Sequence, residues 1–398
     1  MSMFVFLFGL WTLSVEGLRN NVCNRWSDYS NKDFSPFCFY NPDVGANSIQ
    51  LAERYNYQIQ THKVITEDGY ILTVYRIANS TTSFGIGLQP VFLLHGTISS
   101  SEIWMQNGLE SIPFVLANIG FDVWLGNTRG NYNSPSHADA NITPMEYWNN
   151  TFDDLVKDVP AVLDYIAENT NKAGEIVYIG HSAGALEAVA YASDRPEHAK
   201  KNLKAIIGIA PAVYLPKEQF MVNLVRLILR FNLVKFDIKS NVFHEICTTN
   251  VVTISLCRTF VYLLFGNSRI DDPAQFIVTV RTFPDRVALK PFVQYIQFAD
   301  SGEFKKFDYG KTANLMMYGQ ETPPKYDLGR ITVPFHSFIG ASDTLVTEQN
   351  CLKLHNELNV ENSLRVIQDY DHISFFTANN THDMFLVPLL KLMERLRT

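Results

Sequence analysis

The stretch that decides the fold reads Ile176-Val-Tyr-Ile-Gly180-His-Ser182-Ala-Gly184-Ala-Leu-Glu-Ala-Val-Ala190. An apolar run typical of a buried strand leads into Gly-x-Ser-x-Gly, and a helix-forming segment follows directly. Gly180 and Gly184 lack a Cβ, so backbone can crowd around a sharp turn that keeps the Ser182 hydroxyl exposed. The dipole of the following helix favours negative charge near this turn. The pattern predicts a nucleophile elbow, with an ordinary β-α turn containing two glycines as the alternative.

Short apolar runs, separated by amphipathic stretches of helix length, lie on both sides of this turn along the chain. Runs that are apolar throughout are buried on both faces, which is typical of parallel strands covered by helices. Residues 59–78 differ, because two β-rich runs meet at Asp68-Gly69 and predict an antiparallel hairpin. We therefore predict an α/β fold with a mostly parallel central sheet and helices on both faces. The expected parallel strands are 91–94, 123–125, 176–179, 205–209, 335–339 and 364–367.

The spacing of the expected strands is broken once. A crossover between parallel strands needs about a dozen residues, but roughly 125 separate Ile209 from Phe335. The apolar, helix-periodic segments 220–230 and 253–265 indicate that the excess forms an inserted helical cap. The hydrophobic stripe in residues 217–240 fits either a mobile lid or plain helix packing. The predicted segments are a signal peptide (1–17), a core in two parts (18–213 and 309–398) and the cap or lid insertion (214–308).

The N-terminal segment contains an apolar run of about a dozen residues that ends in a small-x-small pattern at Val15 and Gly17. This pattern predicts a cleaved signal peptide; because no Lys or Arg precedes the run, an uncleaved anchor is the alternative. No later run reaches the roughly 20 apolar residues of a membrane span. We expect a secreted, extracellular or lysosomal glycoprotein, with carbohydrate at the Asn-x-Ser/Thr sequons of Asn79, Asn141, Asn149 and Asn379.

Composition limits the remaining possibilities. With 398 residues, 46% hydrophobic and 18% charged, the chain can bury a large core. A net charge of -7 provides no basic stripe for a phosphate backbone, so we expect an uncharged substrate and no nucleic acid partner. No spacing of Cys and His is typical of a metal site, and we predict neither a metal nor a cofactor. The five cysteines allow one small loop between Cys247 and Cys257 and another between Cys23 and Cys38, and leave Cys351 over.

A serine hydroxyl becomes a nucleophile only when a base removes its proton, and the base needs a carboxylate that fixes its tautomer. Behind an elbow of this kind the chain order is Ser, acid, His. Asp343 directly follows the expected strand 335–339, and His372 follows the strand 364–367. Position therefore selects Asp343 and His372 as partners of Ser182, with Asp371 and His382 as the alternatives.

A tetrahedral intermediate needs two backbone N–H donors. Ala183, the residue after the expected nucleophile, supplies one. The other is expected from Thr97, in the turn after the strand 91–94, where Gly96 permits close approach. His95 precedes this turn, and we interpret it as a structural residue that orients the loop, the alternative being a catalytic histidine.

Several longer stretches resemble the acid lipase family of the α/β-hydrolase superfamily, the group that contains gastric lipase and lysosomal acid lipase. The resemblance extends over about residues 40 to 395, and its most specific element is Trp-Leu-Gly-Asn-x-Arg-Gly-Asn at 124–131. The other matching stretches are Tyr40-Asn-Pro-Asp, Thr66-Glu-Asp-Gly-Tyr-Ile-Leu72, Leu94-His-Gly96, Gly180-His-Ser-Ala-Gly184, Phe298-Ala-Asp-Ser-Gly302, Pro323-Pro-Lys-Tyr326 and Asp371-His372.

The resemblance implies an α/β-hydrolase fold with a cap and lid, and hydrolysis of triacylglycerols or cholesteryl esters at a lipid-water interface. It places the catalytic triad on Ser182, Asp343 and His372 and the oxyanion donors on Thr97 and Ala183, and it implies a cap disulfide between Cys247 and Cys257. The chain departs from the family at Ala183, where the family has Gln, and in the residues around Asp343. Substrate preference is therefore open to alternatives: a short-chain, wax-ester or retinyl-ester hydrolase, or a non-catalytic lipid-binding or storage protein on the same scaffold.

Overall fold

The computed structural model describes residues 19–397 except 81–83, 85, 86, 232, 234, 238 and 239, so the predicted signal peptide lies outside the described residues. Within them, the largest element is a nine-stranded sheet with the strand order β13-β12-β9-β8-β5-β6-β4-β3, to which β7 adds beside β4. Its strands are β3 (Tyr57–Ile65), β4 (Tyr70–Asn79), β5 (Gln89–Leu94), β6 (Phe121–Gly126), β7 (Ser136–His137), β8 (Ile176–His181), β9 (Leu203–Ile209), β12 (Phe335–Gly340) and β13 (Asn362–Ile367).

The sheet is parallel from β6 to β13 and antiparallel at its other side, where β3 and β4 form a hairpin and β4 pairs with β6. Each expected strand lies within one of these strands, and the predicted hairpin at 59–78 is β3 and β4, so these predictions are confirmed. Strands β5, β6 and β8 are buried along their whole length. The expectation of burial on both faces is wrong for β13, which is largely exposed, because it is an edge strand with a single neighbour.

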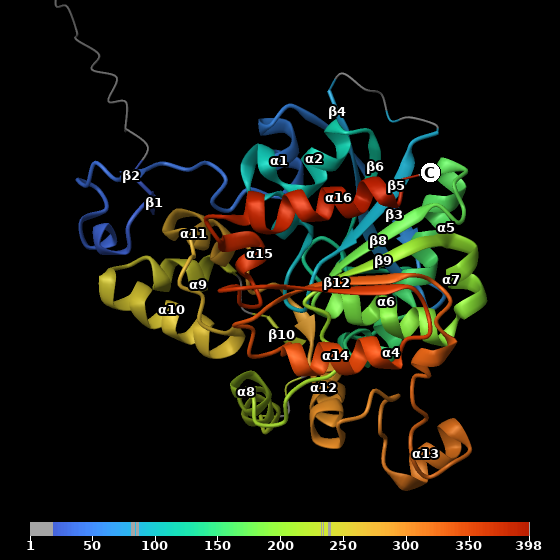
Figure 1. Cartoon of the computed structure of the whole chain (residues 1–398). Coiled ribbons are helices and arrows are strands. Elements are labelled where there is room, and N and C mark those ends of the chain that lie inside the picture. The colour runs from blue at the N-terminus through green and yellow to red at the C-terminus, as the bar shows by residue number, and fades with distance from the viewer. Residues whose placement is uncertain are drawn as a thin grey trace, which may run out of the picture.

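Helices cover both faces of the sheet (Figure 1). α2 (Ile112–Asn118) and α16 (Val387–Arg395) lie on one side, and α5 (Asp158–Thr170), α6 (Ala183–Asp194) and α14 (Glu348–Glu357) lie on the other. Helix α6 is buried along nearly its whole length, which fits its run of small and apolar residues. The shorter helices of the core are α1 (Ser48–Arg54), α3 (Pro144–Tyr147), α4 (Phe152–Leu155), α7 (Pro196–Asn202) and α15 (Ser374–Thr377).

The chain between β9 and β12 forms a largely helical insertion. Helices α8 and α10 correspond to the two helical segments expected at 220–230 and 253–265, and α8, α9 and α10 lie to one side of the sheet (Figure 1). Helix α13 follows residue 308 and projects from the body of the molecule. The elements are α8 (Phe220–Leu229), β10 (Lys235–Phe236), α9 (Ser240–Cys247), α10 (Val251–Phe265), α11 (Pro273–Arg281), β11 (Val287–Ala288), α12 (Lys290–Ser301) and α13 (Lys311–Tyr318).

Two disulfides join neighbouring elements. Cys23 and Cys38 link the paired strands β1 (Val22–Cys23) and β2 (Cys38–Phe39), and Cys247 and Cys257 link α9 to α10. Both pairings that the spacing allowed are thus formed, including the one that the family resemblance implied, and Cys351 is a buried free thiol. None of the helices in the described part of the chain combines the length and the apolar character that a bilayer crossing requires.

Candidate active site

Ser182 lies at the turn between β8 and α6. Its backbone has a φ of 53° and a ψ of -114°, a region that non-glycine residues rarely adopt. A Cβ on Gly180 would lie 2.5 Å from the backbone nitrogen of Ala185, and a Cβ on Gly184 would lie 2.3 Å from the carbonyl oxygen of Leu94. Both glycines are therefore required by close backbone approach, and the surrounding packing holds Ser182 in a strained conformation.

Ser182, His372 and Asp343 form a continuous chain of hydrogen bonds. His372 Nε2 lies 2.8 Å from Ser182 Oγ, and His372 Nδ1 lies 2.8 Å from Asp343 Oδ2. The other carboxylate oxygen of Asp343 accepts hydrogen bonds from the backbone N–H groups of Leu345 and Val346, each at 2.8 Å. Asp343 is thus fixed by its own loop, and it in turn fixes the tautomer and orientation of the imidazole.

The two alternative partners lie elsewhere. The His382 side chain is about half exposed and pairs with the neighbouring Asp383 at 2.8 Å. Asp371 is buried and accepts hydrogen bonds from the backbone and the hydroxyl of Ser374. Among the described residues, His382 makes no hydrogen bond to Ser182, and the partner of the His372 Nδ1 is Asp343 rather than Asp371, so position along the chain selected the residues that the fold brings together.

The expected oxyanion donors flank the serine. Ala183 is the first residue of α6, so its N–H has no acceptor within the helix. Thr97 follows Gly96 in the loop after β5, and both residues line the same cavity as Ser182. The next residue, Ile98, has a φ of 54°, which marks a sharp turn at this point. Thr97 and Ala183 therefore lie in the wall of the same cavity as Ser182.

His95 holds the loop that carries Thr97. Its Nδ1 lies 2.8 Å from the carbonyl oxygen of Gly96, and its Nε2 accepts from Thr128 N–H and from the Asn131 side chain, each at 3.3 Å. Burial lowers the pKa of His95 to about 4, so the ring is neutral at physiological pH. Because Nε2 is an acceptor, the proton resides on Nδ1 and is donated to Gly96, which suits a structural role.

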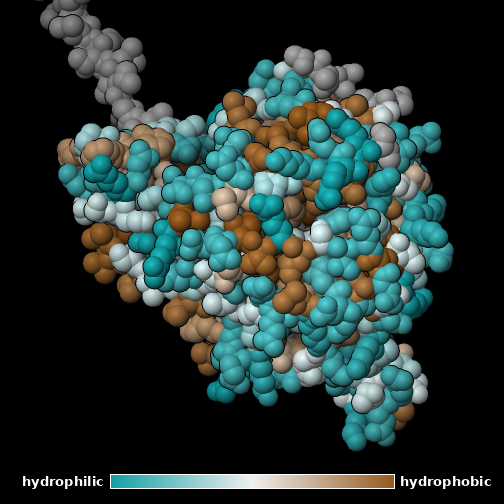
Figure 2. Space-filling view, in the orientation of Figure 1, coloured by the Kyte–Doolittle hydropathy of each residue, from teal (hydrophilic) through white to brown (hydrophobic). Residues whose placement is uncertain are grey.

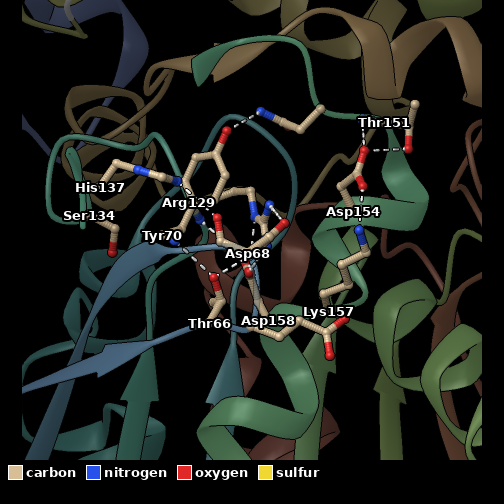
Figure 3. Close-up of polar contacts among 12 residues, drawn as sticks. Thr66, Asp68, Tyr70, Arg129, Ser134, His137, Thr151, Asp154, Lys157 and Asp158 are labelled. Atoms are coloured by element: carbon tan, nitrogen blue, oxygen red, sulfur yellow. Dashed lines mark hydrogen bonds and ion pairs between the residues drawn. The ribbon is translucent and has the colours of Figure 1, made fainter. Parts of the chain in front are cut away.

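Arg129, within the 124–131 motif, is the centre of a buried ion-pair network. Its guanidinium lies between the carboxylates of Asp68 and Asp158 and over the ring of Tyr70, at 4.0 Å from the ring centroid (Figure 3). Burial raises the pKa of Asp158. Burial also acts to raise the pKa of Asp68, but the hydrogen bonds and charge of Arg129, together with Thr66 and Lys157, lower it below its usual value. This ion-pair network ties the hairpin turn and α5 to the loop that holds His95, a role that the motif alone did not reveal.

Two further contacts of His372 were not foreseen. Phe265, the last residue of α10, stacks on the imidazole with ring centroids 5.5 Å apart, and its carbonyl oxygen accepts the N–H of His372 at 3.2 Å. His181 Nε2 donates to the carbonyl oxygen of His372 at 3.0 Å, and burial lowers the pKa of His181 to about 3. No local pattern links a helix of the insertion to a histidine more than a hundred residues later, so sequence reasoning had no signal for Phe265.

An apolar cavity of about 60 Å³ lies over the Ser182 hydroxyl. Its walls come from the core and from the insertion, and the insertion contributes chiefly aromatic side chains. Among the described residues, no three His, Cys, Asp or Glu side chains are placed to hold a metal ion. The apolar wall residues include Ile103, Leu186, Leu215, Met221, Phe265, Phe283, Phe292, Tyr295, Leu345 and Ile373.

Two family models and several curated relatives match this chain. The family model of the α/β hydrolase fold matches residues 89–379, and the model of the partial α/β-hydrolase lipase region matches residues 48–108. Gastric triacylglycerol lipase of Rattus norvegicus is 32% identical over 355 residues, which are 85% of this chain and 89% of the relative. Lipase member K of Homo sapiens is 31% identical and covers 89% of this chain and 92% of its own length.

The fold is also found among solved structures. A soluble variant of monoglyceride lipase from Saccharomyces cerevisiae, bound to a substrate analog, superposes with a TM-score of 0.52 at 15% identity over 86% of this chain and 95% of that chain. An esterase from Exiguobacterium antarcticum gives a TM-score of 0.51 at 14% identity over 84% of this chain and 100% of that chain. These likenesses show the fold alone, whereas the family models and the lipase relatives show descent. The chain belongs to the acid lipase family of the α/β-hydrolase superfamily, and it is an enzyme that hydrolyses ester bonds.

Proposed function

We propose that this enzyme is a lipase that hydrolyses the carboxylic ester bonds of neutral lipids, triacylglycerols or cholesteryl esters, through an acyl-enzyme on Ser182. The observation that carries the proposal is the hydrogen-bond chain from Ser182 through His372 to Asp343, which ends in an apolar cavity. The names of the relatives support triacylglycerol as substrate, and the lining supports an uncharged acyl chain.

The reaction proceeds in two halves. His372 takes the proton of Ser182 as the serine oxygen attacks the ester carbonyl carbon, and the Asp343 carboxylate faces the imidazolium that forms. His372 then gives this proton to the leaving alcohol, and the acyl group remains on Ser182. Water attacks the acyl-enzyme with His372 as base, and the fatty acid leaves as the serine regains its proton.

The oxyanion is the main charge to stabilise. The N–H groups of Thr97 and Ala183 act as its donors, and the neutral His95 keeps the Thr97 loop in place. Backbone donors held by a packed loop need no reorganisation during the reaction, and losing one such donor costs about 3 kcal/mol of transition-state stabilisation. Replacement of the family's Gln by Ala183 leaves this function intact, because the side chain at that position does not donate.

Substrate entry requires movement of the insertion. A cavity of about 60 Å³ is far smaller than the roughly 300 to 1,000 Å³ of a typical ligand site. Met221 of α8, Phe265 of α10 and Tyr295 of α12, all from the insertion, form part of the cavity wall. We therefore assign the lid function to the insertion, which encloses the ester and excludes water when it closes.

The outer face of the insertion supports action at a lipid-water interface. Apolar side chains of α8 and α10 are exposed, and Figure 2 shows several separate hydrophobic patches along the lower left edge, where these helices lie. Exposed apolar patches of this kind mark contact with membranes or other apolar surfaces. The exposed residues of α8, α9 and α10 include Phe220, Leu227, Val242, Ile246, Val252, Leu256 and Leu263.

Disulfides and sequons support a secreted or lysosomal location. Disulfides persist in oxidising compartments, and the chain has two. The sequon asparagines Asn141, Asn149 and Asn379 are exposed and Asn79 is partly exposed, so all four are accessible for glycan attachment. The two disulfides and the exposed sequons thus fit passage through the secretory pathway.

The decisive test replaces the nucleophile. We expect Ser182→Ala to lose hydrolysis of long-chain triacylglycerol by a factor of about 10⁴ or more and to lose labelling by a fluorophosphonate. Ser301→Ala, an exposed serine at the end of α12, is the matched control and should retain both. Activity of Ser182→Ala near that of the unmodified enzyme would refute the mechanism, and absence of labelling in the unmodified enzyme would favour a non-catalytic lipid-binding protein.

The small cavity supports a second candidate, an esterase for short-chain substrates. A lipase acts best on long acyl chains and gains activity when its substrate forms an interface. A short-chain esterase prefers butyrate esters and gains no activity when the substrate forms an interface. A chain-length series measured below and above the solubility limit of each ester separates the two.

A further inference from the structure

Residues 19–40 form a small module, here called the N-terminal module, that lies before the residues matched by either family model. Its strands β1 and β2 are joined by the Cys23–Cys38 disulfide, and both cysteines are buried. The two family models match residues 48–108 and 89–379. Among the described residues, the wall of the cavity over Ser182 includes none from this module. The matched family models therefore assign the module no role.

The N-terminal module exposes four aromatic side chains within seven residues, which we call the aromatic cluster. The exposed fractions are 84% for Phe34, 39% for Phe37, 42% for Phe39 and 41% for Tyr40. Arg25 lies beside them, with its guanidinium carbon 3.8 Å from the centroid of the Phe37 ring. Single exposed apolar side chains are common on soluble proteins, but apolar side chains that gather in one exposed place mark a contact surface.

Contacts with the insertion hold the module in place. The guanidinium carbon of Arg258 in α10 lies over the Trp26 ring, 3.7 Å from its centroid, and the Trp26 ring packs edge-on against Phe276 of α11 at 5.3 Å. The hydroxyl of Tyr29 donates to the carbonyl oxygen of Pro273, the first residue of α11, at 3.1 Å. The disulfide and these contacts fix the module against α10 and α11, so the aromatic cluster loses little conformational freedom when it binds.

The N-terminal module and α10 lie on the same edge of the molecule (Figure 1). Figure 2 shows tan surface on the lobe at the upper left, where β1 and β2 lie, above the hydrophobic patches at the lower left. Helix α10 itself exposes Val252, Leu256 and Leu263. The aromatic cluster is therefore next to the surface through which the insertion is proposed to meet a lipid.

The chemistry of the aromatic cluster fits the phospholipid monolayer that covers a neutral-lipid particle. Aromatic rings are favoured at the level of the headgroups, and a guanidinium forms charge-assisted hydrogen bonds with phosphate. We propose that the N-terminal module is a second lipid anchor, in which the aromatic cluster inserts into this monolayer and Arg25 pairs with its phosphate groups. The module holds the enzyme at the surface beside the insertion. The proposal rests on the proposed lipase function for the nature of the surface.

Binding without turnover tests the anchor. The experiment uses Ser182→Ala, so that no substrate is consumed, and a triolein emulsion coated with phosphatidylcholine. In this background the aromatic variant, Phe34→Ser with Phe37→Ser and Phe39→Ser, should bind the emulsion about tenfold more weakly in a flotation assay, because less apolar area enters the lipid. Its melting temperature should stay unchanged. Arg25→Gln should weaken binding about threefold, and this loss should disappear at about 1 M salt.

The matched control removes three exposed apolar side chains from the core. Ile65, Leu109 and Met145 are 61%, 61% and 70% exposed, and their joint replacement by Ser should leave emulsion binding as it is. Undiminished binding by the aromatic variant, or an equal loss in the core variant, would overturn the proposal.

The variant Phe34→Trp reports contact with the lipid directly. Compared with Ser182→Ala alone, the added indole should emit at shorter wavelength on the emulsion and should be quenched by brominated phosphatidylcholine. Emission that stays at the wavelength of an indole in water would overturn the proposal. A second copy of the chain is the rival occupant of this surface. Dimerisation that the aromatic variant abolishes while it still binds the emulsion would show that the cluster is a dimer contact instead.

Catalysis gives a separate readout. With Ser182 restored, the aromatic variant should keep the kcat of the unmodified enzyme for a soluble ester, because the cluster lies outside the cavity wall. If the unmodified protein neither hydrolyses esters nor reacts with a fluorophosphonate, the proposed function fails. The lipid anchor is decided independently, by the flotation assay and the fluorescence of Phe34→Trp in the inactive background.

Discussion

The turn between β8 and α6 and the insertion from α8 to α10 present opposite kinds of structure. The turn is buried, and its backbone path is dictated by close contacts at Gly180 and Gly184 that admit no side chain. The insertion exposes apolar side chains on α8 and α10, and Phe265 at the end of α10 stacks on His372 of the core. We infer from this difference that the proposed chemistry depends on the buried turn, while the proposed admission of the substrate depends on the insertion.

The largest effect is expected from the acid of the hydrogen-bond chain. Asp343→Asn keeps an oxygen that can accept from Leu345 and Val346, so the loop should remain folded. The amide cannot fix the required tautomer of His372, and kcat for a soluble ester should fall by about 10⁴. Steady-state kinetics measures the loss of kcat, and circular dichroism checks that the variant is folded. A folded variant with more than a tenth of the normal kcat would contradict the proposed role of Asp343.

The rigidity of the turn predicts the next effect. In Gly184→Ala the added Cβ meets the backbone oxygen of Leu94 at 2.3 Å, which the neighbouring strand cannot avoid. We expect a loss of about 3 kcal/mol in the free energy of unfolding, measured by urea denaturation, together with loss of activity. Gly302→Ala is the control: its Cβ meets nothing within 4 Å and only its φ of 66° is strained, so the loss should be about 1 kcal/mol. Equal losses in the two variants would contradict the close-packing argument.

Substitutions on the surface of the insertion should change activity at an interface but not stability, unlike those at the turn. Replacing the exposed Leu227 of α8 and Leu256 of α10 by Ser should lower activity on emulsified triacylglycerol about tenfold, because less apolar surface enters the interface. Activity on a soluble ester and the melting temperature should remain unchanged. Leu109, which is 61% exposed on the core, provides the control, and Leu109→Ser should leave all three measurements as they are. An equal loss on soluble and emulsified esters would locate the effect in the site rather than at the interface.

The smallest effect is expected at the free thiol. Cys351 is buried beside the Ser337 hydroxyl, and burial raises its pKa to about 11, so it is unreactive in the folded chain. Cys351→Ser should cost about 1 kcal/mol in the free energy of unfolding and leave kcat unchanged. Rapid reaction of the native thiol with a maleimide would show that α14 opens more readily than its packing suggests.

How far the sequence predicts the structure follows from how local each feature is. The elbow is a single stretch of chain, and Asp343 and His372 each lie a few residues past the end of a predicted strand, so their meeting at one sheet edge follows from the order of the strands. Parallel strands bring their carboxyl ends to the same edge, which is why position selected His372 over His382.

The features that the sequence did not predict are contacts between distant segments. The stacking of Phe265 on His372, and the Arg129 ion pairs with Asp68 and Asp158, join parts of the chain that share no spacing or periodicity. The prediction that β13 is buried on both faces overlooked Arg365, which lies between Leu364 and Val366, and the strand order shows that β13 is an edge strand.

The contacts at the end of α10 limit how the insertion can move. The carbonyl oxygen of Phe265 accepts the backbone N–H groups of Thr344 and His372, and Gly266 forms a β-bridge with Asp343. The loops of Asp343 and His372 are thus both hydrogen-bonded to the end of α10. Movement of this end would break the contacts that hold the loops of Asp343 and His372. For the proposed lid we therefore expect this end of α10 to stay in place, and the opening for the lipid to form on the side of α8.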